Sequence, residues 1–158
     1  MHPWPPPCYQ RAAAFVTDPV GRLLVFDHVD VPASGTQVPA GGIHEGESPE
    51  TAVIRELFEE SGIDDAQLVR KLGEAWRVAE AGSVPPGLEE QIGHAFHLAL
   101  GDLAGRERWE WDECDGGDVV KHRFALRWTS LDQAAEELWP TQAMWLPSLR
   151  CSLDRLHT

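Results

Sequence analysis

Basic residues are scarce in this sequence: 13 lysines and arginines stand against 26 aspartates and glutamates, which gives a formal net charge of −13 over 158 residues. Proteins that track nucleic acid backbones neutralise the phosphates with Lys and Arg, so we do not expect an extended nucleic acid as partner. The same surplus of negative charge would repel a polyanionic substrate. Binding such a substrate would therefore require a metal ion.

Cysteines and long hydrophobic runs are also few. The three cysteines, at positions 8, 114 and 151, are an odd number without C-x-x-C spacing, which argues against a disulfide framework and against a zinc knot. No apolar stretch approaches the roughly 20 residues of a membrane helix. The first residues lack the basic and apolar regions of a signal peptide. We therefore predict a cytoplasmic protein without a membrane partner.

The composition is that of an ordinary globular chain, with 42% hydrophobic and 25% charged residues. We expect an extended Pro-rich segment over residues 1–10 and a single domain over residues 11–158. Apolar runs bounded by turn-forming residues predict strands over 11–17, 22–27, 67–79, 91–100 and 122–129. The first two strands are expected to form a hairpin, because residues 18–21 are of the turn-forming type.

The remaining segments complete an α/β pattern. A loop rich in Pro and Gly is expected to contain one short strand near 36–38, and residues 101–118 are expected to form an acidic loop. Helices are predicted over 131–138 and 141–156, with Pro140 as the break between them. Strands, one early helix, more strands and closing helices predict an α/β fold packed in layers.

The early helix has clear signals at both ends and is expected from about Pro49 to Ser61. Ser48 suits the N-cap, Pro49 suits the first helical position, and Gly62 suits the left-handed residue that ends a helix. Successive residues turn by about 100°, so one side of the helix carries three carboxylates, Glu56, Glu59 and Glu60. We expect these to face outward and an apolar stripe to be buried, made of Ile54, Leu57, Phe58 and Ser61.

The three glutamates on one side of the helix destabilise it, so their placement needs an explanation. Like charges at these spacings oppose a helix by about 0.2–0.5 kcal/mol per pair, and Arg55 relieves only part of this repulsion. A solvated acidic face is the simplest interpretation. However, the stripe is contiguous, and the loop before the helix adds Gly41, Gly42, Glu45 and Glu47. Oxygen-only clusters of this kind suit hard cations such as Mg²⁺ or Mn²⁺.

The segment GGIHEGESPETAVIRELFEESGI, from Gly41 to Ile63, resembles the signature of the Nudix hydrolase family, G-x5-E-x7-R-E-U-x-E-E-x-G-U, where U is a bulky aliphatic residue. Nine positions fit without a gap, namely Gly41, Glu47, Arg55, Glu56, Leu57, Glu59, Glu60, Gly62 and Ile63. The late strand and helix HRFALRWTSLDQAAEEL are also similar to this family. The resemblance implies an αβα sandwich with a mixed central sheet.

The resemblance also implies a reaction, the hydrolysis of a nucleoside diphosphate linked to another moiety. It implies Mg²⁺ or Mn²⁺ as cofactor, held by Glu56, Glu59 and Glu60 with a backbone carbonyl from Gly41. The implied catalytic residues are Glu56 and Glu60, with Arg55 holding Glu47 and orienting the glutamates. A cation suits this chemistry because a phosphoanhydride repels anionic nucleophiles through its own charge.

Several points stay open at this level. The general base is either Glu56 or a downstream glutamate, for which the candidates are Glu89, Glu90, Glu110 and Glu113. Relatives that act on ADP-ribose or on diadenosine polyphosphates usually carry a Pro or a Tyr, respectively, near positions 79–81. This chain has Ala79, Glu80 and Ala81 there, so the resemblance does not identify the substrate.

Three tryptophans are candidates for stacking on a nucleobase, Trp76, Trp109 and Trp111, and Glu113 is a further candidate for contact with the substrate. For Trp76 a place in the core is favoured, because it lies in an apolar strand. His94 is expected to be a hydrogen-bonded core histidine. The partner is a small nucleotide derivative, and a homodimer is left open. The rival interpretations are a non-catalytic sensor of nucleotide derivatives and an isomerase of the same fold.

Overall fold

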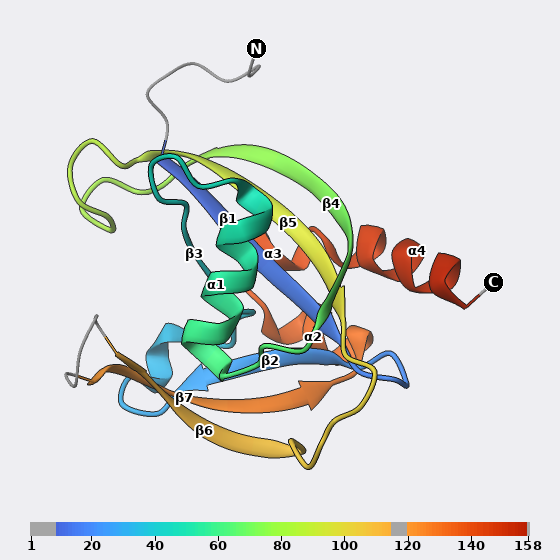
Figure 1. The fold of residues 1–158 in the computed structure, drawn as a ribbon. Helices are drawn as coiled ribbons and strands as arrows, with labels where there is room; N and C mark the ends of the chain where they lie inside the picture. Colours follow the sequence, from blue (N-terminus) through green and yellow to red (C-terminus); the bar gives the residue numbers. More distant parts are fainter. Residues whose placement is uncertain (1–8, 115–119, 158) are drawn as a thin grey trace.

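The computed structural model describes residues 9–114 and 120–157 (Figure 1). The elements within these ranges follow one another in this order: β1 (Tyr9–Thr17), β2 (Leu23–His28), the 3₁₀ turn η1 (Pro32–Ser34), β3 (Ala40–Gly42), α1 (Pro49–Ser61), β4 (Gln67–Val78), β5 (Glu90–Ala99), β6 (Arg108–Cys114), β7 (Val120–Thr129), α2 (Leu131–Glu137), α3 (Pro140–Ala143) and α4 (Leu146–Leu156). Residues 1–8, most of the predicted Pro-rich segment, lie outside the described ranges, whereas Tyr9 and Gln10 already belong to β1.

The strands form one mixed sheet in the order β4-β5-β1-β2-β7-β6, with β3 added beside β1. β1 and β5 are parallel along their whole length, from Tyr9–Gln91 to Thr17–Ala99. β1 and β2 form the predicted hairpin, but they pair only near the turn, at Thr17 and Leu23. Beyond that point β2 pairs with β7. The two halves of the sheet therefore diverge from the hairpin, and α1 lies over the region where they separate (Figure 1).

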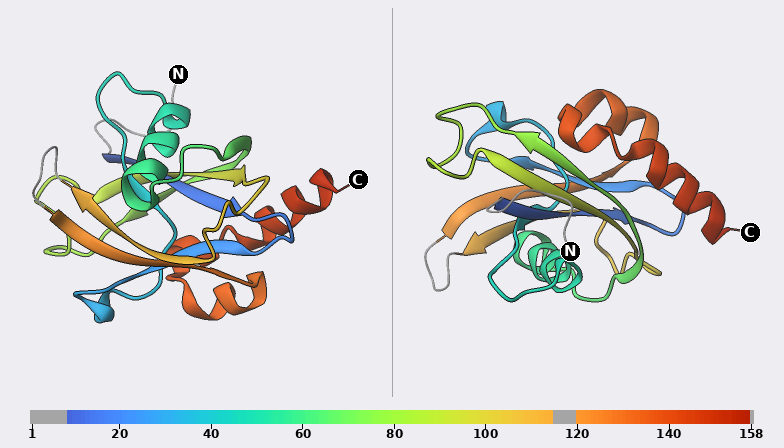
Figure 2. Two further views of the ribbon diagram at one scale, coloured as in Figure 1. Left: turned by 60° about the horizontal axis from the view of Figure 1, so that its bottom comes forward. Right: turned by 90° about the horizontal axis from the view of Figure 1, so that it is seen from above.

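The sheet is covered on both faces, as the α/β prediction requires. Figure 2 shows α1 on one face and the closing helices α2 to α4 on the other. Ala52, Val53 and Leu57 of α1 pack on one core together with Phe96 and Leu126 of the sheet. A second core joins Phe15, Val25 and Ala95 to Leu138 and Leu149 on the closing helices. The αβα sandwich is therefore confirmed.

Helix α1 begins and ends where the sequence predicts. The hydroxyl of Ser48 accepts a hydrogen bond from the backbone N–H of Thr51, and Gly62 is left-handed with φ 79°. The predicted orientation of the helix is correct for Leu57 and Ser61, which are buried, and for Glu59, which is exposed, but it is wrong for the other four residues. Ile54 and Phe58 are 48% and 47% exposed, whereas Glu56 and Glu60 are only 7% and 6% exposed.

The helix faces the sheet with its smaller residues and with two of its carboxylates. The other buried residues of α1 are Ala52, Val53, Leu57 and Ser61. This is possible because β3 offers glycine backbone to the carboxylates, which leaves room where a side chain would otherwise stand. An assignment of the buried helix face from hydrophobicity alone misses this arrangement, because it assumes that charged side chains face water.

Three further predictions need correction. The short strand lies at Ala40–Gly42 rather than at 36–38, where Thr36 and Gln37 form only isolated bridges. Residues 108–114 of the predicted acidic loop are strand β6, paired with β7. Tryptophans and acidic residues alternate in β6, a period of two that suits a strand at the edge of a sheet. The predicted helix over 141–156 is two helices, α3 and α4, and Pro140 begins the first of them.

The buried histidines agree with their predicted structural role. His94 is 2% exposed, with Nδ1 2.8 Å from Lys71 Nζ and Nε2 2.8 Å from Gln10 Oε1. His97 is fully buried and joins Thr17 Oγ1 (2.8 Å) to Ser152 Oγ (2.6 Å). Within the described ranges, no helix has the length and apolar character needed to cross a membrane.

Candidate metal centre and adjoining cavity

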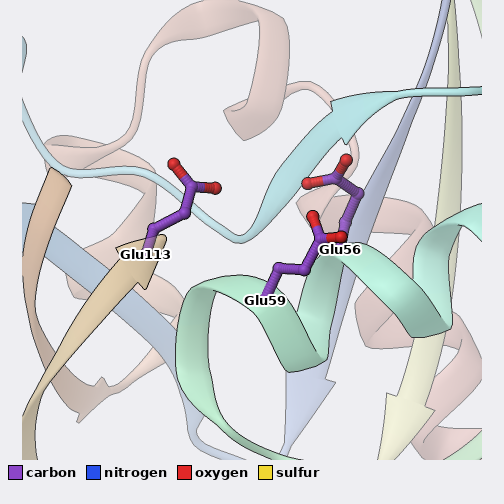
Figure 3. Close-up of side chains that lie close together, drawn as sticks. All are labelled: Glu56, Glu59 and Glu113. Atoms are coloured by element: carbon purple, nitrogen blue, oxygen red, sulfur yellow. The ribbon is translucent and has the colours of Figure 1, made fainter. Parts of the chain in front are cut away.

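Three carboxylates converge at the surface of α1. Glu56 and Glu59 lie on the helix, Glu113 lies near the end of β6, and one oxygen of each lies within 4.8 Å of the other two. Figure 3 shows the three carboxylate groups on the same side of α1. Exposed acidic groups often cluster without a ligand, but Glu56 is almost completely buried. A buried carboxylate beside two others calls for a compensating positive charge.

Two tryptophans of β6 bring Glu113 to the helix. The indole N–H of Trp109 donates to the carbonyl of Ser61 (2.9 Å), and that of Trp111 donates to the carbonyl of Glu59 (3.0 Å). Gly62 lets the Trp111 ring approach closely, because a Cβ at Gly62 would lie 2.6 Å from Cζ3 of that ring. These contacts fasten β6 to the C-terminal end of α1, where free carbonyls are available.

Arg55 holds the opposite side of the cluster. Its Nε and Nη2 donate to the two carboxylate oxygens of Glu47, at 2.8 and 2.9 Å. Its Nη1 donates to Glu56 (2.8 Å) and to Glu59 (3.2 Å), and Nη2 also donates to the carbonyl of Gly42 (2.8 Å). One guanidinium therefore fixes three glutamates and the β3 backbone. The hydrogen bonds from Arg55 lower the pKa of Glu47 to about 2.

Gly41 provides the space that Glu56 occupies. A Cβ at position 41 would lie 2.1 Å from Cδ of Glu56, and within 2.3 Å of both of its carboxylate oxygens. No side chain fits at that distance, so the requirement for glycine here is close approach. The backbone of β3 and the carboxylate of Glu56 are thus in direct contact, which places the Gly41 residue at the edge of the cluster.

Glu60 lies beneath this cluster. Its Oε1 accepts the backbone N–H of Ala40 at 2.7 Å, and it is not a member of the three-carboxylate group, although it was predicted as a ligand alongside Glu56 and Glu59. Burial raises the pKa of Glu60 well above its usual range, and the negative charges of Glu113 and Glu56 raise it further. This carboxylate is therefore held where its ionised form is costly.

The pKa values of two carboxylates in the cluster are raised. Burial is the main cause that raises the pKa of Glu56, against the opposing effect of Arg55. Burial is also the main cause that raises the pKa of Glu113, with Lys121 and His122 opposing it. Glu56 and Glu113 would ionise more readily if a cation stood between them. The donor set consists only of carboxylate oxygens, which is the chemistry that Mg²⁺ and Mn²⁺ prefer.

A cavity of about 330 Å³ is lined by residues of β1, β4, β5 and the closing helices. Ala40 lines it, and the N–H of the same residue holds Glu60. Its other lining residues include two arginines, three tryptophans and several amides, among them Arg11, Arg77, Trp76, Trp139, Trp145, Gln91 and Gln142. The sequence prediction did not include Arg11, Arg77, Trp139 or Trp145.

The predicted site residues divide into separate groups. Of the downstream candidates for the general base, only Glu113 reaches the carboxylate group in the described ranges. Glu90 and Glu110 are exposed, and Glu89 accepts the N–H of Gly87 instead. Trp76 is 44% exposed and lines the cavity, so its expected place in the core is wrong. Trp109 and Trp111 pack on α1 and do not line the cavity.

Comparison with known proteins gives one consistent family. The family model described as NUDIX domain matches residues 9–149. The chain is 30% identical over 143 residues to "Nudix hydrolase 26, chloroplastic" of Arabidopsis thaliana, an alignment that covers 84% of this chain and 63% of the plant protein. It is 41% identical over 49 residues to an RNA pyrophosphohydrolase of Gluconobacter oxydans (strain 621H), covering 31% of this chain and 29% of that protein.

A solved structure shows the same fold. The E. coli dihydroneopterin triphosphate pyrophosphohydrolase superposes with a TM-score of 0.65 and 19% identity, covering 87% of this chain and 91% of that one. At such identity the likeness concerns the fold. The chain spans less than two thirds of the length of the plant and bacterial sequences to which it is similar.

Proposed function

The chain belongs to the Nudix family, and on that premise we propose that it is a pyrophosphohydrolase that depends on Mg²⁺ or Mn²⁺. Its substrate is a small nucleotide derivative, in which it cleaves a phosphoanhydride bond of a nucleoside diphosphate linked to another moiety. The observation that carries the proposal is the convergence of Glu56 and Glu59 on α1 with Glu113 on β6, within 4.8 Å. Arg55 holds the first two in place through hydrogen bonds. The RNA pyrophosphohydrolase among its relatives supports the same bond type.

The residues present fit a hard divalent cation. The three converging carboxylates would hold it, with Glu60 and the Gly41 backbone beside them. When bound, such an ion neutralises phosphate oxygens and makes water more acidic. Arg55 holds the carboxylates at fixed spacing through its hydrogen bonds to Glu47, Glu56 and Glu59. Preorganised ligands of this kind need little rearrangement during the reaction.

Two carboxylates qualify as the acceptor of the proton from the attacking water. Glu56 is buried and hydrogen-bonded to Arg55. The carboxylate of Glu113 comes from β6 and accepts no hydrogen bond within the described part of the chain. A base works best when its pKa approaches the working pH, and burial shifts the pKa of both groups upward. We propose Glu113 as the acceptor, because Arg55 donates a hydrogen bond directly to the carboxylate of Glu56, whereas Lys121 and His122 act on Glu113 only through their charge.

The test is turnover by the purified protein on a panel of dinucleoside polyphosphates, nucleotide sugars, nucleoside triphosphates and 5′-triphosphorylated RNA, with Mg²⁺, with Mn²⁺ and with EDTA. We expect hydrolysis that requires the metal. Glu60→Gln should reduce it about tenfold to hundredfold, as for a group that supports the metal ligands. Glu50→Gln is the matched control, because Glu50 lies on the first turn of the same helix, outside the cluster. Tight binding across the panel without turnover would contradict the proposal and support a sensor.

A further inference from the structure

We propose that His28 and His122 form a second metal site, which binds a borderline transition metal such as Zn²⁺ or Ni²⁺ rather than the hard cation of the three-carboxylate group. The two histidines lie on β2 and β7, neighbouring strands that run side by side (Figure 1). Such a site is independent of the proposed hydrolase function, and neither histidine belongs to the signature segment.

Strand pairing places both imidazoles on the face of the sheet that α1 covers. His28 follows Phe26 by two residues on β2, and His122 precedes Phe124 by two residues on β7. Phe26 and Phe124 belong to the core beneath α1, and side chains two residues apart in a strand point to the same face. His122 is also the register partner of Glu113 on β6. The histidine pair therefore lies at the end of the sheet that carries Glu113.

The distance between the two rings suits a shared ion. Their centroids are 5.6 Å apart, and their planes are inclined at 84°. Zinc binds a histidine nitrogen at about 2.0–2.1 Å, which places the ion about 3 Å from the centroid of each ring. Two imidazoles that share one ion therefore have centroids roughly 5–6 Å apart. The spacing of His28 and His122 falls within this range.

His28 has a buried nitrogen whose bonding capacity is unused. Among the buried and half-buried side chains of residues 9–114 and 120–157, its Nδ1 is the one buried nitrogen or oxygen without a hydrogen-bond partner. A buried polar atom in that state is costly, and a bound ion is one way to satisfy it. Burial lowers the pKa of His28, and the charge of His122 lowers it further, against the effect of Asp27. The neutral imidazole, which is the form that binds a metal, is therefore favoured.

Aromatic packing holds both rings in place. His122 is stacked on Phe124, with centroids 5.9 Å apart and planes inclined at 24°. His28 makes a T-shaped contact with the same ring, at 4.9 Å and 85°. Phe124 is 1% exposed, so one fixed core residue supports both imidazoles. Ligands whose orientation is set by their surroundings need little rearrangement to bind a metal.

The donor atoms select the kind of metal. Imidazole nitrogen suits Zn²⁺, Ni²⁺ and Cu²⁺, whereas carboxylate oxygen suits Mg²⁺ and Mn²⁺. In the described part of the chain, no third His, Cys, Asp or Glu joins the two histidines at the spacing that defines the three-carboxylate group. Water therefore completes the coordination, on the side of the exposed His122. A site with two protein ligands and exchangeable water binds its metal reversibly, unlike a closed structural site.

The test is titration of the protein with Zn²⁺ in excess Mg²⁺, followed by calorimetry and by the ¹⁵N chemical shifts of the histidine side chains. We expect the imidazole nitrogens of His28 and His122 to shift together as Zn²⁺ binds. His28→Gln and His122→Gln should each weaken this binding at least about tenfold, because each removes one of two protein ligands. Glu59→Gln should leave it unchanged, which separates this site from the three-carboxylate group.

His157→Gln is the matched control, because it removes an exposed histidine at the end of α4 and should not change the affinity for Zn²⁺. The nitrogen shifts are measured on the wild type, so they test the site even where a variant fails to fold. Zn²⁺ that shifts neither His28 nor His122, or that binds both variants with the wild-type affinity, overturns the inference. Neither result bears on the proposed hydrolysis, which is measured without Zn²⁺.

Discussion

Arg55 and Glu47 form a two-point ion pair, with Nε to Oε2 at 2.8 Å and Nη2 to Oε1 at 2.9 Å. Glu47 precedes the helix and Arg55 lies in its middle, so the pair ties the loop to α1. The same guanidinium reaches Glu56 and the carbonyl of Gly42. A lysine has one point charge and cannot make this set of contacts. The geometry of the carboxylate cluster thus depends on a residue whose own role is positioning.

The ion pair predicts an acid-dependent loss of stability. The pKa of Glu47 is about 2 in the folded protein, below its ordinary value of 4.5. The stabilisation is therefore complete above pH 4.5 and is lost as the pH falls toward 2. We expect Glu47→Gln to be less stable than the wild type at pH 7, with a difference that shrinks toward pH 2. Urea unfolding at several pH values measures this, and a difference independent of pH would contradict it.

Glu60 predicts a pH dependence of stability with the opposite sign to that of Glu47. Its pKa is raised in the folded state, so the stability of the metal-free protein falls as the pH rises above about 4.5, the ordinary value for the group. Glu60→Gln retains an oxygen for the N–H of Ala40 and removes the charge. In EDTA at pH 7 we expect this variant to melt at a higher temperature than the wild type. Added Mn²⁺ should stabilise the wild type more than the variant, and Glu50→Gln should behave like the wild type.

A side chain at position 41 is expected to clash with the carboxylate cluster. An added Cβ would lie 2.1 Å from Cδ of Glu56, so Gly41→Ala must displace either the strand or the carboxylate. We expect a loss of about 1–3 kcal/mol in the free energy of unfolding, as for overpacking of a core, together with weaker Mn²⁺ binding. Gly101→Ala is the matched control, because a Cβ there meets nothing within 4 Å. Equal stability of the two variants would refute the assignment.

The alternation of β6 predicts different roles for two nearby glutamates. Glu113 belongs to the three-carboxylate group, whereas Glu110 is exposed outside it. We expect Glu113→Gln to weaken Mn²⁺ binding roughly tenfold or more, which is the order expected for removing a group that serves a metal site. Glu110→Gln should leave it unchanged. Titration of free Mn²⁺ by electron paramagnetic resonance measures both, and equal affinities would remove Glu113 from the site.

His97 predicts a second acid-sensitive feature, far from α1 on the side of α4. Burial lowers the pKa of His97 to about 4, and the charge of Arg70 contributes. The unfolded chain takes up a proton near the ordinary pKa of 6.5, so stability is lost as the pH falls from 6.5 toward 4. His97→Gln should flatten this part of the stability curve. His157→Gln, at an exposed position, should not change it.

Local signals decided which parts of the fold the sequence predicted well. The cap at Ser48 and the left-handed Gly62 act within a few residues, so the limits of α1 were predicted correctly. The period-two pattern predicts β5 and β7 closely but not β6, because its run of acidic residues is also typical of a loop. The expected burial of Ile54 and Phe58 was wrong because it depends on what the sheet presents to the helix.

By itself, the sequence determined the fold class, the helix and the set of signature residues, since caps, periodicity and spacing are properties of neighbouring residues. Only the tertiary structure decided that Glu113 joins Glu56 and Glu59, and that Arg11 and Arg77 line one cavity together with three tryptophans. The physical reason is that strand pairing and helix packing bring together residues far apart in the chain. Their mutual distance, burial and charge, on which binding depends, exist only once the sheet has formed.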